Sequence, residues 1–230
     1  MHIVAIGDTH GRRTWQRVVA LEQDATRVVF LGDFFDSWHE TPADQLDNFY
    51  KILAYKRANP EKVVLLMGNH DFQYILHGER YSGYNAIGAP NYKVAIEDAL
   101  SDRSLLVAYE EEGYLFSHAG VTKTWAYVFE LNPKDIANEI NFLFRHNPLA
   151  FSFDRRDASG CGEDKRQSPL WVRPGALLPD MLKGYVQVVG HTTQREGIDT
   201  SLYDQLILAD AIDIGEYLVI QKEGLLVGKV

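Results

Sequence analysis

Five short motifs follow one another along the chain, and each supplies a carboxylate, an imidazole or an amide oxygen directly after an apolar run. These groups are typical ligands of divalent metal ions. One such motif alone would be weak evidence, whereas five in series predict a metal site. The motifs are Gly7-Asp8-Thr9-His10-Gly11, Gly32-Asp33-Phe34-Phe35-Asp36, Gly68-Asn69-His70-Asp71, Ser117-His118-Ala119-Gly120 and Gly190-His191-Thr192-Thr193.

The types of these side chains indicate the charge that the site would carry. Asp8 and His10 are two residues apart, so both side chains point the same way in an extended segment. Oxygen and imidazole donors without cysteine favour Mn, Fe, Co or Zn over a closed structural zinc site. Asn69 would add no negative charge, so two divalent ions beside Asp8 and Asp33 would retain a charge of about +2. Such a site is suited to bind an anion.

Short apolar runs alternate with amphipathic segments in the first third of the chain. Ile3–Ile6, Val28–Leu31 and Val63–Met67 are typical of strands buried on both faces. Thr14–Gln23 and Ala43–Ala58 show helical periodicity between them. The order predicts a parallel core with right-handed crossovers.

The second of these predicted helices has a start signal and an apolar stripe. Thr41-Pro42 predicts a capping residue followed by proline at the first helical position. The stripe is predicted to contain Leu46, Phe49, Tyr50, Leu53 and Ala54.

The rest of the chain predicts further strands, one helix and one long polar loop. A hairpin is expected from Ser104–Tyr109 and Tyr114–Ser117 around Glu110–Gly113, a helix over Pro133–Arg145, a mobile loop over Phe151–Ser168, and strands at Tyr185–Val189, Leu206–Asp210, Tyr217–Gln221 and Leu225–Lys229. We therefore expect one α/β (α+β) domain over residues 1–230, a sandwich with a mixed sheet, flanked by helices. The motifs then lie at the carboxyl ends of five strands, where ligands bind in such sheets.

Composition narrows the function classes. The net charge is −9 and no long basic cluster is present, which disfavours nucleic-acid binding. The start of the chain does not predict a signal peptide, and no apolar run approaches the length of a membrane span, which predicts a cytoplasmic protein. The lone Cys161 excludes an internal disulfide and is expected to be a spectator. Four histidines outside the motifs are expected to have no role in the site: His2, His39, His77 and His146.

The ordered motifs resemble those of the calcineurin-like metallophosphoesterase superfamily over Gly7 to Thr193. The resemblance is strongest to the branch of serine/threonine protein phosphatases and bacterial diadenosine tetraphosphatases. Nuclease and phosphodiesterase branches typically end in Gly-His-x-His, and Thr193 takes the place of that last histidine here.

The resemblance implies a role for each motif residue. Asp8, His10 and Asp33 would hold one metal; Asp33 would bridge to a second, held also by Asn69, His118 and His191. His70, with Asp36 behind it, would protonate the leaving oxygen. Two ions about 3.5–4 Å apart can activate a bridging water for in-line attack, and a carboxylate keeps an imidazole able to donate a proton.

One departure from the family pattern concerns the phosphate clamp. The protein phosphatases usually continue the second motif as Asp-Arg-Gly, whereas Ser37-Trp38 follows Asp36 here. Arg173 lies in a segment that resembles the source of a second phosphate-binding arginine, and Arg12 directly follows the first motif. These two arginines are the predicted substrate-binding residues.

The predicted function is phosphomonoester hydrolysis by a metal-bridging hydroxide, with two divalent ions, Mn first and Fe, Zn, Co or Ni as alternatives. The expected partner is a phosphoprotein, a nucleotide or a small phosphate ester. Alternatives are a symmetrical dinucleoside polyphosphate hydrolase, a phosphodiesterase or nuclease, and a non-catalytic scaffold. Tyr81, Tyr84 and Tyr92 could stack on a base, although packing of their loop is the favoured role. Asp213-Ile214-Gly215 is expected to be structural only.

Overall fold

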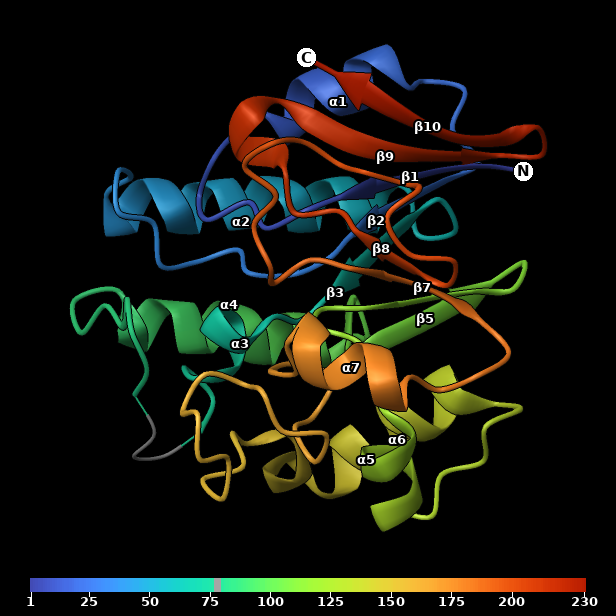
Figure 1. Cartoon of the computed structure of the whole chain (residues 1–230). Helices are drawn as coiled ribbons and strands as arrows, with labels where there is room; N and C mark the ends of the chain where they lie inside the picture. The colour runs from blue at the N-terminus through green and yellow to red at the C-terminus, as the bar shows by residue number, and fades with distance from the viewer. Residues whose placement is uncertain (77–79) are drawn as a thin grey trace.

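The computed structural model describes residues 1–76 and 80–230 and contains two β-sheets (Figure 1). The larger sheet has six strands in the order β10-β9-β1-β2-β3-β4. Their bounds are β1 (His2–Ile6), β2 (Arg27–Phe30), β3 (Val63–Leu66), β4 (Leu105–Leu106), β9 (Glu216–Gln221) and β10 (Gly224–Lys229).

The four strands from β1 to β4 are parallel, as the alternation of strands and helices predicts. The C-terminal β9 pairs antiparallel with β1 and completes a mixed sheet, so both ends of the chain lie in one layer (Figure 1). The apolar runs form these strands because both faces of the sheet are covered.

The smaller sheet packs against the larger one and forms a sandwich. Its order is β5-β6-β7-β8, with bounds β5 (Ala108–Glu111), β6 (Tyr114–Ser117), β7 (Val186–Val189) and β8 (Leu206–Leu208). Ile3, Val29 and Leu66 of one sheet share a buried apolar cluster with Phe116 and Ile207 of the other. The predicted mixed-sheet sandwich is confirmed.

Helices cover the opposite face of the six-stranded sheet and the outer side of the smaller one. Val18, Phe49 and Ile96 pack from three helices onto the strand residues Val28 and Phe30 in a second apolar cluster. The bounds are α1 (Trp15–Leu21), α2 (Pro42–Ala58), α3 (Asn69–Phe72), α4 (Ala89–Ser101), α5 (Lys123–Val128), α6 (Ile136–His146) and α7 (Pro174–Asp180). The predicted helices correspond to α1, α2 and α6, whereas the other four were not predicted.

The start of α2 is as predicted, but its buried stripe is not. The Thr41 hydroxyl accepts a hydrogen bond from the amide of Asp44, and Pro42 is the first helical residue. Tyr50 is 45% exposed and Ala54 is also exposed. The polar Gln45 and Asn48 are buried instead because their amides have partners; these partners are the Ser37 amide, the Glu40 carbonyl, the Trp15 indole and the Arg12 carbonyl.

The predicted hairpin is shorter than expected, because its first strand divides between the two sheets. Leu105–Leu106 pairs with β3, and Ala108–Glu111 pairs with β6 around a two-residue turn at Glu112 and Gly113. Asn141 of α6 accepts hydrogen bonds from the amides of Val107 and Ala108 at the crossing point. The tertiary contact therefore decides where the strand breaks.

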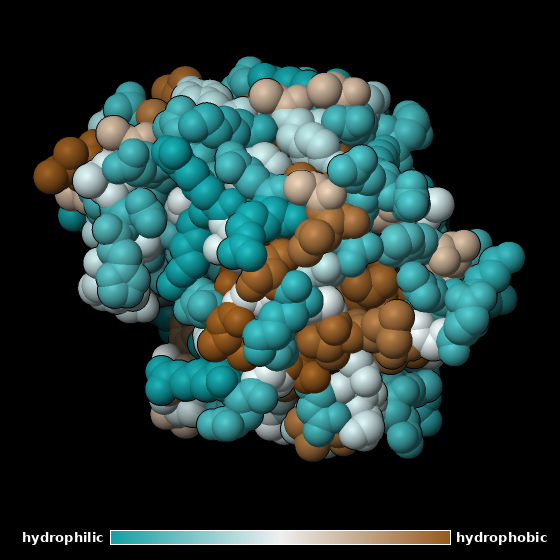
Figure 2. Space-filling model, turned by 90° about the horizontal axis from the view of Figure 1, so that it is seen from above, coloured by the Kyte–Doolittle hydropathy of each residue, from teal (hydrophilic) through white to brown (hydrophobic). Residues whose placement is uncertain are grey.

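The remaining predicted strands, β7 to β10, lie within two residues of their expected bounds. The face that carries α1 and β10 is mostly hydrophilic, with hydrophobic residues gathered over part of it (Figure 2). Among the residues that the structure describes, no helix is long and apolar enough to cross a membrane.

Candidate metal centre and catalytic cleft

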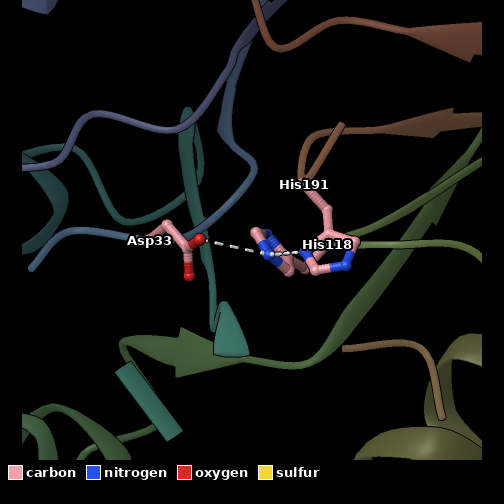
Figure 3. A group of neighbouring side chains, drawn as sticks. All are labelled: Asp33, His118 and His191. Atoms are coloured by element: carbon pink, nitrogen blue, oxygen red, sulfur yellow. Dashed lines mark hydrogen bonds and ion pairs between the residues drawn. The ribbon is translucent and has the colours of Figure 1, made fainter. Parts of the chain in front are cut away.

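The side chains of all five motifs meet where strands of both sheets end. Asp8 and His10 follow β1, Asp33 follows β2, and Asn69 begins α3 directly after β3. His118 follows β6 and His191 follows β7, so both sheets of the sandwich contribute. Figure 3 shows Asp33, His118 and His191 pointing toward one another from three elements. The predicted convergence of five strand ends is confirmed.

The ligand atoms form two groups that share one residue. Asp8, His10 and Asp33 form the first group, and within it all ligand atoms lie within 4.8 Å of one another. Asp33, His118 and His191 form the second group by the same measure. A carboxylate common to two groups of donors is suited to bridge two ions.

The amide oxygen of Asn69 completes the second group. Its Oδ1 lies 2.8 Å from Nε2 of His118 and 2.9 Å from Nδ1 of His191. Nε2 of His118 in turn lies 3.4 Å from Oδ2 of Asp33. Two imidazole nitrogens, one amide oxygen and one carboxylate therefore lie within reach of a single ion.

Each histidine of the two groups is oriented by a backbone carbonyl. Nδ1 of His10 donates to the carbonyl of Phe35 at 2.6 Å, and Nδ1 of His118 donates to that of Leu31 at 2.8 Å. Nε2 of His191 donates to the Trp171 carbonyl at 3.2 Å. In each ring this hydrogen bond leaves the other nitrogen to face the ligand group, where an unprotonated nitrogen is the form that binds metal.

The charges of the site also fit cations. Burial, followed by the charges of Asp210 and Asp33, raises the pKa of Asp8 well above its usual value. Burial opposes ionisation of Asp33, but the neighbouring His118, His70 and His10 outweigh it and lower the pKa of Asp33. Burial lowers the pKa of His191 well below its usual value, so this imidazole is neutral. Crowded carboxylates and a neutral imidazole are the states that a divalent ion stabilises.

The backbone at the motifs is held in unusual conformations. His10, Asp33, Asp36 and His191 all have positive φ, at 44°, 53°, 66° and 60°. Such conformations persist where the surrounding structure enforces them, and they gather at functional sites. A Cβ atom at Gly68 would lie 2.0 Å from Oδ1 of Asp33, so glycine is required for this close approach.

His70 lies beside the two groups rather than within them. Its Nδ1 is 2.8 Å from Oδ2 of Asp36, and its backbone amide donates to Oδ1 of Asp33 at 2.9 Å. Burial alone would lower the pKa of His70, but the charges of Asp33 and Asp36 outweigh burial and raise it to about 9. Bound divalent cations would lower this pKa, since a like charge disfavours the imidazolium.

Asp36 is held by two residues that had no predicted role in the site. The Tyr74 hydroxyl donates to Oδ1 of Asp36 and the Gln73 side-chain amide donates to Oδ2. Both partners follow α3 directly, so the third motif orients the second. Their only signal in the sequence was their position after Gly68-Asn69-His70-Asp71, whose helix α3 was not predicted.

Two buried carboxylates support the metal ligands from behind, and both were missed. Asp71 accepts hydrogen bonds from the amides of Asp33, Phe34 and Gly68 at 2.8–2.9 Å. Asp210 accepts from the amide of Asp8 at 3.3 Å. Asp71 belongs to the third motif, so its position could have identified it as a site residue. Asp210 ends a predicted strand and carried no such signal.

The two candidate phosphate-binding arginines lie in different places. Arg173 borders the cleft that contains His70, and its Nη1 donates to the carbonyl of His191 at 2.7 Å. Arg12 forms an ion pair with Asp213 at 2.9 Å and is not among the described residues that line this cleft. The structure thus brings Arg173, but not Arg12, to the centre.

The cleft has a volume of about 680 Å³ and opens directly onto the second ligand group. Its lining residues are Asn69, His70, Tyr81, Ser82, Phe153, Gly160, Cys161, Trp171, Arg173 and His191. The polar segment 151–168 therefore forms part of the wall. Its expected mobility, and the spectator role of Cys161, remain predictions.

The residues expected to lie outside the site are placed as follows. His2 pairs with Glu22, while His39 and His146 are exposed. His77 lies outside the described residues. Tyr92 belongs to α4 and stacks on Phe35, and Tyr84 stacks on Tyr74, so these two tyrosines pack rather than face the cleft.

The fold and the two groups of ligands define a phosphoesterase class. The chain belongs to the calcineurin-like phosphoesterase family, whose model matches residues 1–194. That family acts on phosphate esters with divalent metals, which places this chain among the hydrolases.

Similarity to individual proteins is more distant. The serine/threonine-protein phosphatase 6 catalytic subunit of Drosophila melanogaster is 25% identical over 177 residues, which are 71% of this chain and 54% of that protein. The phosphatase 4 catalytic subunit of Saccharomyces cerevisiae is 26% identical over 148 residues, 60% of this chain and 45% of that protein. The chain thus spans about half the length of the curated relatives it matches.

A solved structure shares the fold over the whole chain. The cold-active protein-tyrosine phosphatase of a psychrophilic Shewanella superposes with a TM-score of 0.67 and 22% identity, covering 99% of this chain and 77% of that one. At this identity the likeness establishes the fold alone.

Proposed function

We propose that this protein is a phosphatase that hydrolyses phosphate monoesters with two divalent ions, of which Mn²⁺ is the first candidate. The observation that carries the proposal is the pair of ligand groups joined at Asp33, with His70 and Arg173 beside them on one cleft. Asp8 and His10 would complete one ion site. Asn69, His118 and His191 would complete the other.

The ions, when bound, would supply Lewis acidity and lower the pKa of water for direct attack on phosphorus. The protein residues then have separate tasks. Arg173 presents a guanidinium that can bind two phosphate oxygens and stabilise the charge that develops on them. His70 donates a proton from Nε2 to the leaving oxygen, since its Nδ1 is held by Asp36.

The expected preference for monoesters rests on two observations. Thr193 replaces the additional histidine of nuclease-like branches, and its side chain hydrogen-bonds to Asp210. Both curated relatives and the Shewanella structure are named as protein phosphatases, which supports a monoester substrate. A role as a scaffold without catalysis is disfavoured because the whole predicted ligand set and His70 are present.

The test is a parallel rate assay on metal-stripped protein to which Mn²⁺ is returned. It compares a phosphate monoester, a phosphate diester and diadenosine tetraphosphate at equal concentration. Dominant monoester turnover supports the proposal. Preference for the dinucleotide with symmetrical products would replace it by a dinucleoside polyphosphate hydrolase, and metal binding without any turnover would favour the scaffold.

A further inference from the structure

Three aromatic rings form one wall of the catalytic cleft. We call Tyr81, Phe153 and Trp171 the aromatic wall. The ring centroids of Tyr81 and Trp171 are 4.3 Å apart, those of Phe153 and Trp171 are 5.4 Å apart, and those of Tyr81 and Phe153 are 6.4 Å apart. All three residues line the same 680 Å³ cleft as His70 and Arg173.

The aromatic wall begins at the metal ligands themselves. The carbonyl of Trp171 accepts from His191, and the two rings are 6.4 Å apart. The indole nitrogen of Trp171 donates to the carbonyl of Phe151 at 3.1 Å, which fixes the ring. A group that stacks here lies next to the phosphate position rather than far along the cleft.

The wall is also tied to the proton-donating pair. The Tyr81 amide donates to the Gln73 side chain at 2.8 Å, and Gln73 holds Asp36. Two residues further on, a Cβ atom at Gly83 would lie 3.4 Å from Cε1 of His70. The segment that presents Tyr81 therefore packs directly on the His70–Asp36 pair, where the leaving oxygen must sit.

This placement distinguishes between two kinds of aromatic ligand. In an aryl ester one oxygen atom joins the ring to phosphorus, so a bound phosphate brings the ring to the wall. In a nucleotide a sugar separates the base from the phosphate and carries the base farther away. The position of Trp171 beside His191 thus favours the aryl ester.

We propose that the aromatic wall binds an aryl leaving group, so that aryl phosphate monoesters, including phosphotyrosyl side chains, are the preferred substrates. This inference rests on the proposed function. Water oxygen forms a bond to phosphorus, the bond between phosphorus and the aryl oxygen breaks, and that oxygen receives a proton from His70. One proton of the water stays on the phosphate product and the other passes through solvent to restore His70. The products are inorganic phosphate and a phenol.

The test measures binding without hydrolysis. Titration calorimetry on the Mn²⁺-loaded protein compares benzylphosphonate with cyclohexylmethylphosphonate, which has the same charge and a saturated ring of similar size. Stacking adds to simple burial, so benzylphosphonate is expected to bind about 2- to 12-fold more tightly. Inorganic phosphate serves as the probe of the anion site alone.

Variants then assign the preference to the wall. Tyr81→Leu and Phe153→Leu should each lower the ratio of the benzylphosphonate affinity to the cyclohexylmethylphosphonate affinity toward one. Neither variant should change the affinity for inorganic phosphate. Phe142→Leu is the matched control, because Phe142 lies exposed on α6 and stacks on His146. Trp171 is left intact since it is buried and contacts His191 through its carbonyl.

Each outcome separates this inference from the proposed function. Equal affinities for the two phosphonates, with monoester turnover intact, would overturn the aryl preference and leave the phosphatase. Tighter binding of benzylphosphonate than of cyclohexylmethylphosphonate, without turnover of any ester, would support aryl binding at the aromatic wall and overturn the proposed function. Tighter binding of adenosine monophosphate than of benzylphosphonate would overturn the aryl assignment in favour of a base. Turnover of phenyl phosphate and of a phosphotyrosyl peptide then distinguishes a free aryl phosphate from a protein substrate.

Discussion

Replacement of His70 by alanine tests the division of labour in the site most directly. The imidazole belongs to neither ligand group, and only its backbone amide, which alanine retains, contacts Asp33. Asp36 loses one partner but keeps Gln73 and Tyr74. We therefore expect His70→Ala to keep both metal ions while losing the proton donor.

The size of the effect follows from the chemistry of the lost group. A positioned acid contributes about 10²- to 10⁴-fold, so the barrier should rise by about 2.7–5.4 kcal/mol. The loss should depend on the leaving group. An alkyl monoester leaves as a poor alkoxide and should show the full loss, whereas a phenol, with a pKa of about 10, should show less.

The assay pairs two readouts on the same preparations. The kcat for an alkyl and an aryl monoester is measured with Mn²⁺, and the metal content is measured by inductively coupled plasma mass spectrometry. His39→Ala is the control, because His39 is exposed and belongs to no ligand motif. Loss of metal from His70→Ala, or an equal loss of kcat for both esters, would refute the assigned role.

Four further changes test other parts of the site. Asp33→Ala should reduce bound metal from two ions to nearly none by mass spectrometry, because Asp33 belongs to both groups; retention of one ion would refute bridging. Arg173→Ala should raise KM and lower kcat together in a steady-state assay, and no change in either would remove Arg173 from the site. Tyr74→Phe should lower kcat about 10-fold at unchanged metal content, since Asp36 loses a charge-assisted hydrogen bond; full activity would show that Gln73 alone suffices. Asp71→Ala should lower the free energy of unfolding by about 3–5 kcal/mol in urea titration, because three buried amides lose their acceptor; a loss below 1 kcal/mol would contradict this.

Local patterns predicted the strands that carry the ligands, because burial on both faces leaves a continuous apolar run in the sequence. Val28–Leu31 and Val63–Met67 are examples, and each ends within one residue of its prediction. Helices were harder to predict. α2 had a capping threonine and a proline, whereas α3, with four residues, is too short to display a periodicity. The stripe of α2 was misjudged at Tyr50 because burial of Asn48 depends on a partner in another helix.

The sequence alone could not decide which of the two candidate arginines borders the cleft. Arg12 and Arg173 were both reasonable by position, and the ion pair of Arg12 with Asp213 directs one of them away from the cleft. Such a choice depends on contacts between residues about 200 positions apart, which no local pattern contains.

The sequence by itself determined the chemistry of the donors, since a glycine turn after a buried strand specifies both the side chain and its place at a strand end. Only the tertiary structure decided that Asp71 and Asp210 support the ligands, that Arg173 rather than Arg12 borders the cleft, and that Tyr81 packs on Trp171 in the cleft wall. The physical reason is range: periodicity and turn geometry act over a few residues, whereas these supporting and packing contacts arise only when distant segments meet.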